Sequence, residues 1–166
     1  MSTSSHSNKG HLEHIDARVA SVVSSFNLEA KPQVFDSSTA TAAQAAAALS
    51  IDLAQIGKSI AFRADDFAAV VSISGALKVD KFKLRGVVAS KKMRGIDSVA
   101  LEHALDYRAG GLSPLYIPSG ARLYVDRSIE EYDLVYVSAG TINSLVTLSR
   151  GIRGRIFGPD RYDLSM

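Results

Sequence analysis

Hydrophobic residues near the start of the chain recur every three or four positions, which is the period of an amphipathic helix. The pattern predicts a helix over residues 11–27. Thr41 and Gln44 have the spacing of a capping box, so a second helix is expected along the alanine-rich run to Leu49. A third, short helix is expected at residues 53–57, directly before the first long strand.

The middle of the chain alternates between apolar and polar residues, as strands do. Residues 59–63 and 69–74 predict two strands joined by an acidic turn. Helices are expected from Asp80 to about residue 88, and from an N-cap at Asp97 to about residue 105. Further strands are predicted at residues 34–35, 122–126, 134–137 and 143–148, while 91–94 reads as a basic connector or edge strand and the tail from Arg150 has no clear pattern.

Helices and strands are interleaved without the regular spacing of βαβ units, which favours a mixed sheet over a doubly wound parallel one. We therefore predict one α/β domain of the α+β type. Its mixed, mostly antiparallel sheet or partial barrel would be surrounded by helices. The domain is expected to span residues 11–166, after a flexible arm at 1–10.

The amino-acid composition excludes several kinds of site and of location. Hydrophobic residues make up 46% of the chain and charged residues 22%, as in a folded domain. The chain contains no cysteine, which removes disulfides, thiol nucleophiles and cysteine-ligated zinc and fits a reducing cytoplasm. No apolar run approaches the ~20 residues that span a bilayer, and the first ten residues lack the apolar segment of a signal peptide. We expect a cytoplasmic protein with no membrane partner.

Three familiar motifs are incomplete. Residues 57–59 resemble the end of a phosphate-binding loop, but Asp52 stands where that loop needs a glycine. Two histidines and a glutamate within 11–14 lack the spacing of a zinc-binding helix. Ser113 and Ser138 each lack one glycine of a nucleophile elbow. We expect no metal, no other cofactor and no serine triad.

Another set of residues suits hydrolysis of an activated ester. Backbone N–H groups of Gly110 and Gly111 can approach a carbonyl closely, because no Cβ blocks them. Pro114 would stiffen this turn. Lys58, expected at a helix–strand junction, would offer a compact positive charge to the ester or to a neighbouring phosphate. The nucleophile would be water, assisted by a ribose hydroxyl of the substrate.

Three segments carry a family resemblance over roughly residues 34–150. The first runs from the capping box at Thr41 through QIGKSIAFR, which ends at Arg63. The second is YRAGGLSP at 107–114, and the third pairs Val125-Asp126 with VSAG at 137–140. In this order they resemble the YbaK/EbsC-like aminoacyl-tRNA deacylases, which are related to the editing insertion domain of bacterial prolyl-tRNA synthetases.

The resemblance implies hydrolysis of the ester bond of mischarged aminoacyl-tRNA in trans, with alanyl- or cysteinyl-tRNA for proline as substrates. It implies tRNA as partner, together with an aminoacyl-tRNA synthetase. Residues 105–106 and 115–116 depart from the family pattern beside the pocket and bear on which amino acid is removed. The implied catalytic residues are Lys58, Gly110 and Gly111, and the implied substrate-binding residues are Ser113, Pro114, Ser138 and Gly140.

The net charge of +2 demands no nucleic-acid partner, but basic residues cluster between 78 and 94 around a single acid, Asp80. Such a basic stripe suits an RNA backbone, although charge runs are also common on solvated faces. Two other functions stay open: a non-catalytic module that binds tRNA or a protein, and a generic ester or amide hydrolase. The residues expected to bind tRNA are Lys78, Lys81, Lys91, Lys92 and Arg94.

Overall fold

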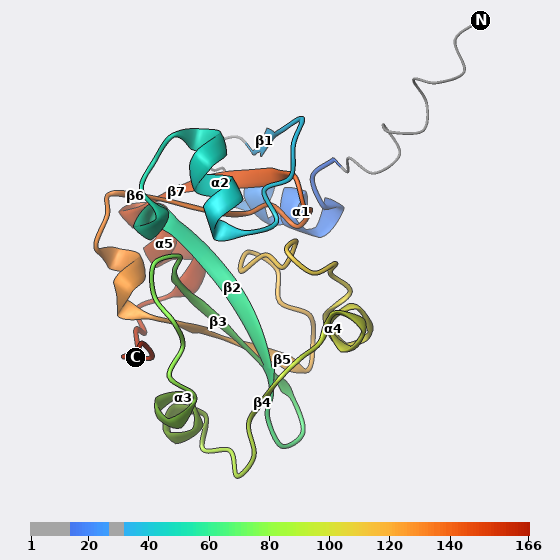
Figure 1. Ribbon diagram of the computed structural model, residues 1–166, viewed down its shortest axis with the longest axis vertical. Helices are drawn as coiled ribbons and strands as arrows, with labels where there is room; N and C mark the ends of the chain where they lie inside the picture. The colour runs from blue at the N-terminus through green and yellow to red at the C-terminus, as the bar shows by residue number, and fades with distance from the viewer. Residues whose placement is uncertain (1–13, 27–31) are drawn as a thin grey trace, which may run out of the picture.

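A mixed, unclosed sheet of seven strands forms the centre of the computed structural model, which describes residues 14–26 and 32–166 (Figure 1). The strand order is β1-β7-β6-β2-β3-β5, and β4 pairs with β2 outside this path. The strands are β1 (Gln33–Val34), β2 (Ile56–Arg63), β3 (Ala68–Ser74), β4 (Arg94–Gly95), β5 (Ala121–Val125), β6 (Leu134–Ser138) and β7 (Ser144–Ser149).

Most strand pairs are antiparallel, namely β1–β7, β2–β3, β2–β4 and β6–β7. The pairs β2–β6 and β3–β5 are parallel. The sheet thus confirms the predicted α/β class with a mixed, mostly antiparallel sheet, and it remains open.

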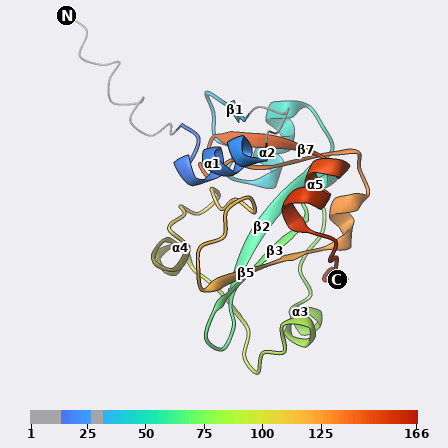
Figure 2. The same cartoon turned by 180° about the vertical axis from the view of Figure 1, so that it is seen from behind.

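Helices cover both faces of this sheet, as Figures 1 and 2 show from opposite sides. Helix α2 packs on one face of β6 and β7, and α1 and α5 pack on the other. Helices α3 and α4 lie on opposite faces of β2 and β3. The described helices are α1 (Ala17–Ser25), α2 (Ala42–Leu49), α3 (Lys81–Val88), α4 (Ser98–Leu105) and α5 (Arg150–Phe157), with short 3₁₀ helices at Leu53–Gln55 and Arg127–Glu130.

Strand β2 joins two parts of the sheet. It pairs with β3 along one side from Gly57 to Arg63. On its other side, β6 pairs only with Ile56 and Gly57, and β4 pairs only with Phe62 and Arg63. Among the described residues, 58–61 therefore have no strand partner on that side. We call this stretch the open edge of β2.

Several helix starts follow the predicted caps. The side chain of Thr41 accepts a hydrogen bond from the Gln44 N–H, and the reciprocal bond completes the capping box of α2. Asp80 and Asp97 cap α3 and α4 in the predicted places. Asp126, which directly follows β5, is fully buried and accepts hydrogen bonds from two backbone N–H groups.

Other boundaries were predicted wrongly. Helix α1 begins at Ala17, because the carboxylate of Asp16 caps its first turn; residues 11–13 of the predicted helix and the predicted arm at 1–10 lie outside the described residues. The helix expected at 53–57 is one 3₁₀ turn, and β2 begins at Ile56 because β6 pairs there. Lys58 consequently lies within a strand.

The unassigned tail forms helix α5, which the fully buried Arg153 fastens to the domain. Its guanidinium donates to the carbonyl oxygens of Tyr132, Asp133 and Leu148 at 2.7, 3.2 and 2.8 Å and pairs with Glu130 at 3.6 Å. Satisfying these carbonyls offsets the cost of burying a charge. No helix among the described residues is both long and apolar enough to cross a membrane.

Candidate functional site

A small pocket lies at the open edge of β2. Its cavity of ≈ 70 Å³ is lined from β2 by Gly57, Lys58 and Ser59. The loop after α4 contributes Gly110, and the end of β6 contributes Ser138. Residues 39–42, which lead into α2, close the remaining side. Figure 1 shows how α2 and the loop after α4 lie beside β2. The pocket brings together segments that are far apart in the sequence.

Lys58 is held at this pocket by its strand and by one hydrogen bond. It pairs with Ile73 in the β2–β3 register, and its half-buried ammonium donates to the carbonyl oxygen of Gly75 at 3.3 Å. An ammonium has three N–H donors, so two remain for a substrate. Burial lowers the pKa of Lys58 below its usual value, and the positive charge of Lys78 lowers it further.

Gly110 has a backbone conformation and a close neighbour that disfavour any side chain at this position. Its φ is +85°, and an added Cβ would lie 2.5 Å from the Cβ and 2.8 Å from the carbonyl oxygen of Ala40. The two predicted glycine donors are not equivalent, because the Gly111 N–H donates to the Arg108 carbonyl oxygen at 2.8 Å. Within residues 14–26 and 32–166, the Gly110 N–H has no hydrogen-bond acceptor. Gly110 is therefore the better candidate to bind a substrate oxygen.

Two predicted serines tie the glycine loop to β6. Ser138 Oγ donates to the Gly111 carbonyl oxygen at 3.0 Å and accepts from the Gly140 N–H at 3.0 Å. The fully buried Ser113 donates to the Ser138 carbonyl oxygen at 2.6 Å and accepts from the Leu115 N–H at 3.2 Å. Ser138 lines the pocket, whereas the hydroxyl of Ser113 serves the loop itself. Ser113 thus stabilises the loop through hydrogen bonds to its neighbours.

Gly140 and Pro114, both expected to contact substrate, are not among the described residues that line the cavity. Gly140 has φ +97°, and a Cβ there would lie 2.3 Å from the Cβ of Asp16. Pro114 is buried within the loop. Both residues shape the packing around the loop, and their contact with substrate stays a prediction.

Arg18 of α1, which sequence reasoning missed, clamps the start of the glycine loop. Its guanidinium lies 4.3 Å from the ring centre of Tyr107 and 5.1 Å from that of Tyr116. It also donates to the Asp106 carbonyl oxygen at 2.7 Å and to the Asp16 carboxylate at 3.0 Å. Such stacked, charge-assisted contacts are strong where they are partly buried.

Tyr107 closes the loop on itself. Its hydroxyl donates to the Tyr116 carbonyl oxygen at 2.8 Å, across the base of the loop. Burial raises the pKa of Tyr107 well above its usual value, so the phenol stays protonated and remains a donor. Both ends of the glycine loop are therefore fixed before any substrate arrives.

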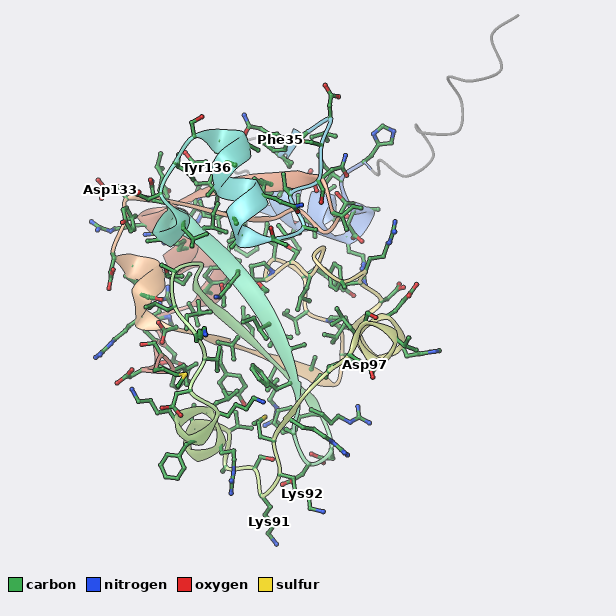
Figure 3. All side chains as sticks on the ribbon, viewed as in Figure 1. Phe35, Lys91, Lys92, Asp97, Asp133 and Tyr136 are labelled. Carbon is green, nitrogen blue, oxygen red and sulfur yellow. The ribbon has the colours of Figure 1, made fainter. Side chains whose placement is uncertain are left out.

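The residues expected to bind tRNA do not form one patch on the surface. Lys78 lies close enough to Lys58 to affect its pKa, whereas Figure 3 shows Lys91 and Lys92 at the far end of the molecule, pointing away from it. Arg94 begins β4 and stands directly opposite Arg63. From Lys58 to Arg63 the strand spans about 17 Å, at ~3.3 Å per residue. Lys81 is the exposed first residue of α3.

Ser59 also lines the pocket, although the sequence did not single it out. Its Oγ atom is buried and has no hydrogen-bond partner among the described residues. No group of three His, Asp or Glu side chains suited to a metal ion occurs in the described part of the chain. His11 and Glu13, considered above as metal ligands, lie outside it.

Comparison with known proteins identifies the family of this chain. The model of one protein family, the aminoacyl-tRNA editing domain, matches residues 36–151. The chain belongs to this family. The matched segment contains the open edge of β2, the glycine loop and the end of β6. The resemblance to this family is thereby confirmed, and aminoacyl-tRNA editing is the general function of the family.

Individual relatives say less about function than the family does. The chain is 28% identical over 125 residues to the uncharacterized protein YwhH of Bacillus subtilis (strain 168), which covers 75% of this chain and 79% of YwhH. A crystal structure of the hypothetical protein APE2540 has a TM-score of 0.82 at 22% identity and covers 90% of this chain and 99% of its own. A structure described as a candidate trans-editing enzyme for prolyl-tRNA synthetase has a TM-score of 0.80 at 23% identity, with 90% and 95% covered. These two structures establish the shared fold.

The close contact between Gly110 and Ala40 makes the loop sensitive to a single methyl group. Gly110→Ala should lower the free energy of unfolding by about 2 kcal/mol, because positive φ and contact with backbone both penalise a Cβ. Gly86→Ala is the matched control: nothing lies within 4 Å of its added Cβ, and alanine should stabilise α3 by ~0.8 kcal/mol. Urea unfolding measures both. Equal effects of the two substitutions would contradict the tight packing inferred for Gly110.

Proposed function

We propose that this chain is a trans-editing deacylase that hydrolyses alanyl- or cysteinyl-tRNA for proline. The observation that carries the proposal is the placement of Lys58 and Gly110 on one small pocket. We further propose tRNA as the direct partner and a synthetase as the source of the mischarged substrate. The trans-editing description of one structural neighbour supports this assignment.

The size of the pocket favours a small amino acid. A cavity of ≈ 70 Å³ is well below the ~300–1,000 Å³ of typical ligand pockets. Ala42 and Ala45 of α2 and Leu112 of the glycine loop give it apolar walls. Such walls suit the methyl group of alanine or the thiol of cysteine. A large or charged side chain would need the walls to move.

In the proposed reaction, a water molecule attacks the ester carbonyl carbon. The carbonyl oxygen gains negative charge as the tetrahedral intermediate forms, and the Lys58 ammonium and the Gly110 N–H stabilise it. The ester C–O bond then breaks, and the ribose oxygen leaves as a hydroxyl after receiving a proton. Because the substrate is already an activated ester, placement and charge stabilisation account for the rate without a covalent intermediate.

Substitution of Lys58 tests the chemistry directly. Lys58→Ala should lower the single-turnover rate of deacylation by ~10²–10³-fold, as loss of one charge-stabilising donor does. Lys58→Arg should rescue poorly, because a planar fork does not reproduce a compact charge. The assay uses a panel of mischarged tRNAs that includes alanyl- and cysteinyl-tRNA for proline. Melting temperatures on the same preparations show whether each variant is folded.

The wild-type rate of deacylation should also fall as the pH rises. The fall should occur at a lower pH than the one at which an ordinary lysine loses its proton. The sign follows from the lowered pKa of Lys58: the ammonium is present below this pKa and is lost as the pH rises through it.

A Lys58→Ala enzyme that melts normally and retains the parent rate would refute the catalytic role. No turnover by folded wild-type protein on any tRNA of the panel would favour a binding module.

Salt dependence tests the distal lysines. If Lys91 and Lys92 bind the tRNA backbone, the double change to alanine should weaken binding and reduce the slope of log K against log salt by about 1–2. Arg150→Ala with Arg155→Ala removes the same charge from α5 and serves as the control. Filter binding over a range of salt concentrations measures the slope. An unchanged slope in the lysine variant would assign these residues to a solvated surface.

A further inference from the structure

Two buried serine hydroxyls face each other beneath the pocket. Ser59 on β2 and Ser72 on β3 are register partners in an antiparallel pair, so both side chains project from the same face of the sheet. Ser72 is fully buried, and Ser59 lines the pocket. Neither Oγ atom has a hydrogen-bond partner among the described residues, including the other serine.

Such a pair is unusual, because buried polar side chains almost always have a partner. In the described part of the chain, only one other side-chain atom shares this condition, the Nε of Arg153. The other nitrogens of that guanidinium are well bonded. The two serines have no such compensation. An adjacent pair of unbonded hydroxyls therefore calls for a polar group that the protein itself does not supply.

The neighbouring residues on this face show that the lack of hydrogen-bond partners is confined to this pair. One pair further along, Ala61 and Val70 are apolar and pack with α4. In the other direction, Ser74 is also buried, but its hydroxyl donates to the carbonyl oxygen of Ala54 at 2.9 Å. Among the described residues on this face, only Ser59 and Ser72 are left without a protein partner.

We propose that Ser59 and Ser72 hold the water molecule that hydrolyses the ester. Directly opposite residues have Cβ atoms about 5 Å apart, a separation that one water can bridge. Ser72 would hold this water from within the core, and Ser59 would hold it at the cavity that Lys58 and Gly110 also line. This inference rests on the proposed deacylase function and adds the position of its nucleophile.

The step balances without another reactant. The water oxygen forms a bond to the carbonyl carbon, and the ester C–O bond breaks. One water proton ends on the departing ribose oxygen, and the other is released as the new carboxylic acid ionises. The serine hydroxyls accept or donate hydrogen bonds and undergo no covalent change. They orient the lone pair of the water and so act as positioning residues.

This role predicts different effects on stability and on rate. Neither hydroxyl bonds to another described group of the protein, so removing its oxygen breaks no such bond, and Ser59→Ala and Ser72→Ala should melt near the parent temperature. Both should slow single-turnover hydrolysis by ~10–100-fold, as misplacement of a reactant does, with little change in KM. Ser59→Thr keeps the hydroxyl and should restore most of the rate. Ser74→Ala, the matched control, should lower the melting temperature and leave the rate intact.

The experiment combines single-turnover deacylation of the preferred mischarged tRNA, melting temperatures and a high-resolution crystal structure of the wild-type protein. A water bonded to both Oγ atoms, together with slow but stable alanine variants, would support the proposal. Parent rates in Ser59→Ala and Ser72→Ala, or a crystal structure with no bridging water, would overturn it. If Ser72→Ala does not fold, Ser59→Ala alone decides the kinetic test. A wild-type protein inactive on every tRNA would overturn the proposed function as well, whereas active wild type with unaffected variants would overturn this inference alone.

Discussion

The way β2 is shared between two parts of the sheet is the constraint on which the site depends. β6 meets only the first residues of β2 and β4 meets only the last, so the strand has an open edge at 58–61. An open strand edge leaves backbone groups and side chains accessible that a neighbouring strand would cover. The protein covers this edge with α2 and the glycine loop, and the small space left between them is the pocket.

Rigidity on the two sides of that space comes from different sources. The β2–β3 pairing fixes Lys58 and Ser59, which follow each other along one strand. The glycine loop is irregular, and contacts from far away in the sequence hold it: the Arg18 guanidinium at its base and the Ser138 hydroxyl at Gly111. Catalysis by fixed dipoles and charges requires such organisation in advance, because donors that must reorganise lose much of their effect. Tyr107 and Ser113, both buried, therefore serve the site without lining it.

Local signals in the sequence were sufficient for the hairpin of β2 and β3 and for the helices capped by Asp80 and Asp97, because caps and alternation act over a few residues. Family resemblance located Lys58 and Gly110. It did not reveal that the Gly111 N–H is already bonded within its turn, or that Arg18 reaches the loop from α1. Those facts depend on tertiary contacts. The Ser59–Ser72 pair depends on strand register, which the alternation of residues along each strand did not reveal by itself.

The central claim is that the aminoacyl end of the substrate binds at the open edge of β2 beside the glycine loop. The most direct measurement is an NMR titration of isotope-labelled protein with a stable, amide-linked alanyl-adenosine analogue. We expect the backbone amide shifts to change chiefly at residues 58–61 and 110–112, with those of Lys91 and Lys92 unaffected. Saturable shifts confined to α3 or to the surface around Arg63 and Arg94, with 58–61 and 110–112 unchanged, would contradict the claim.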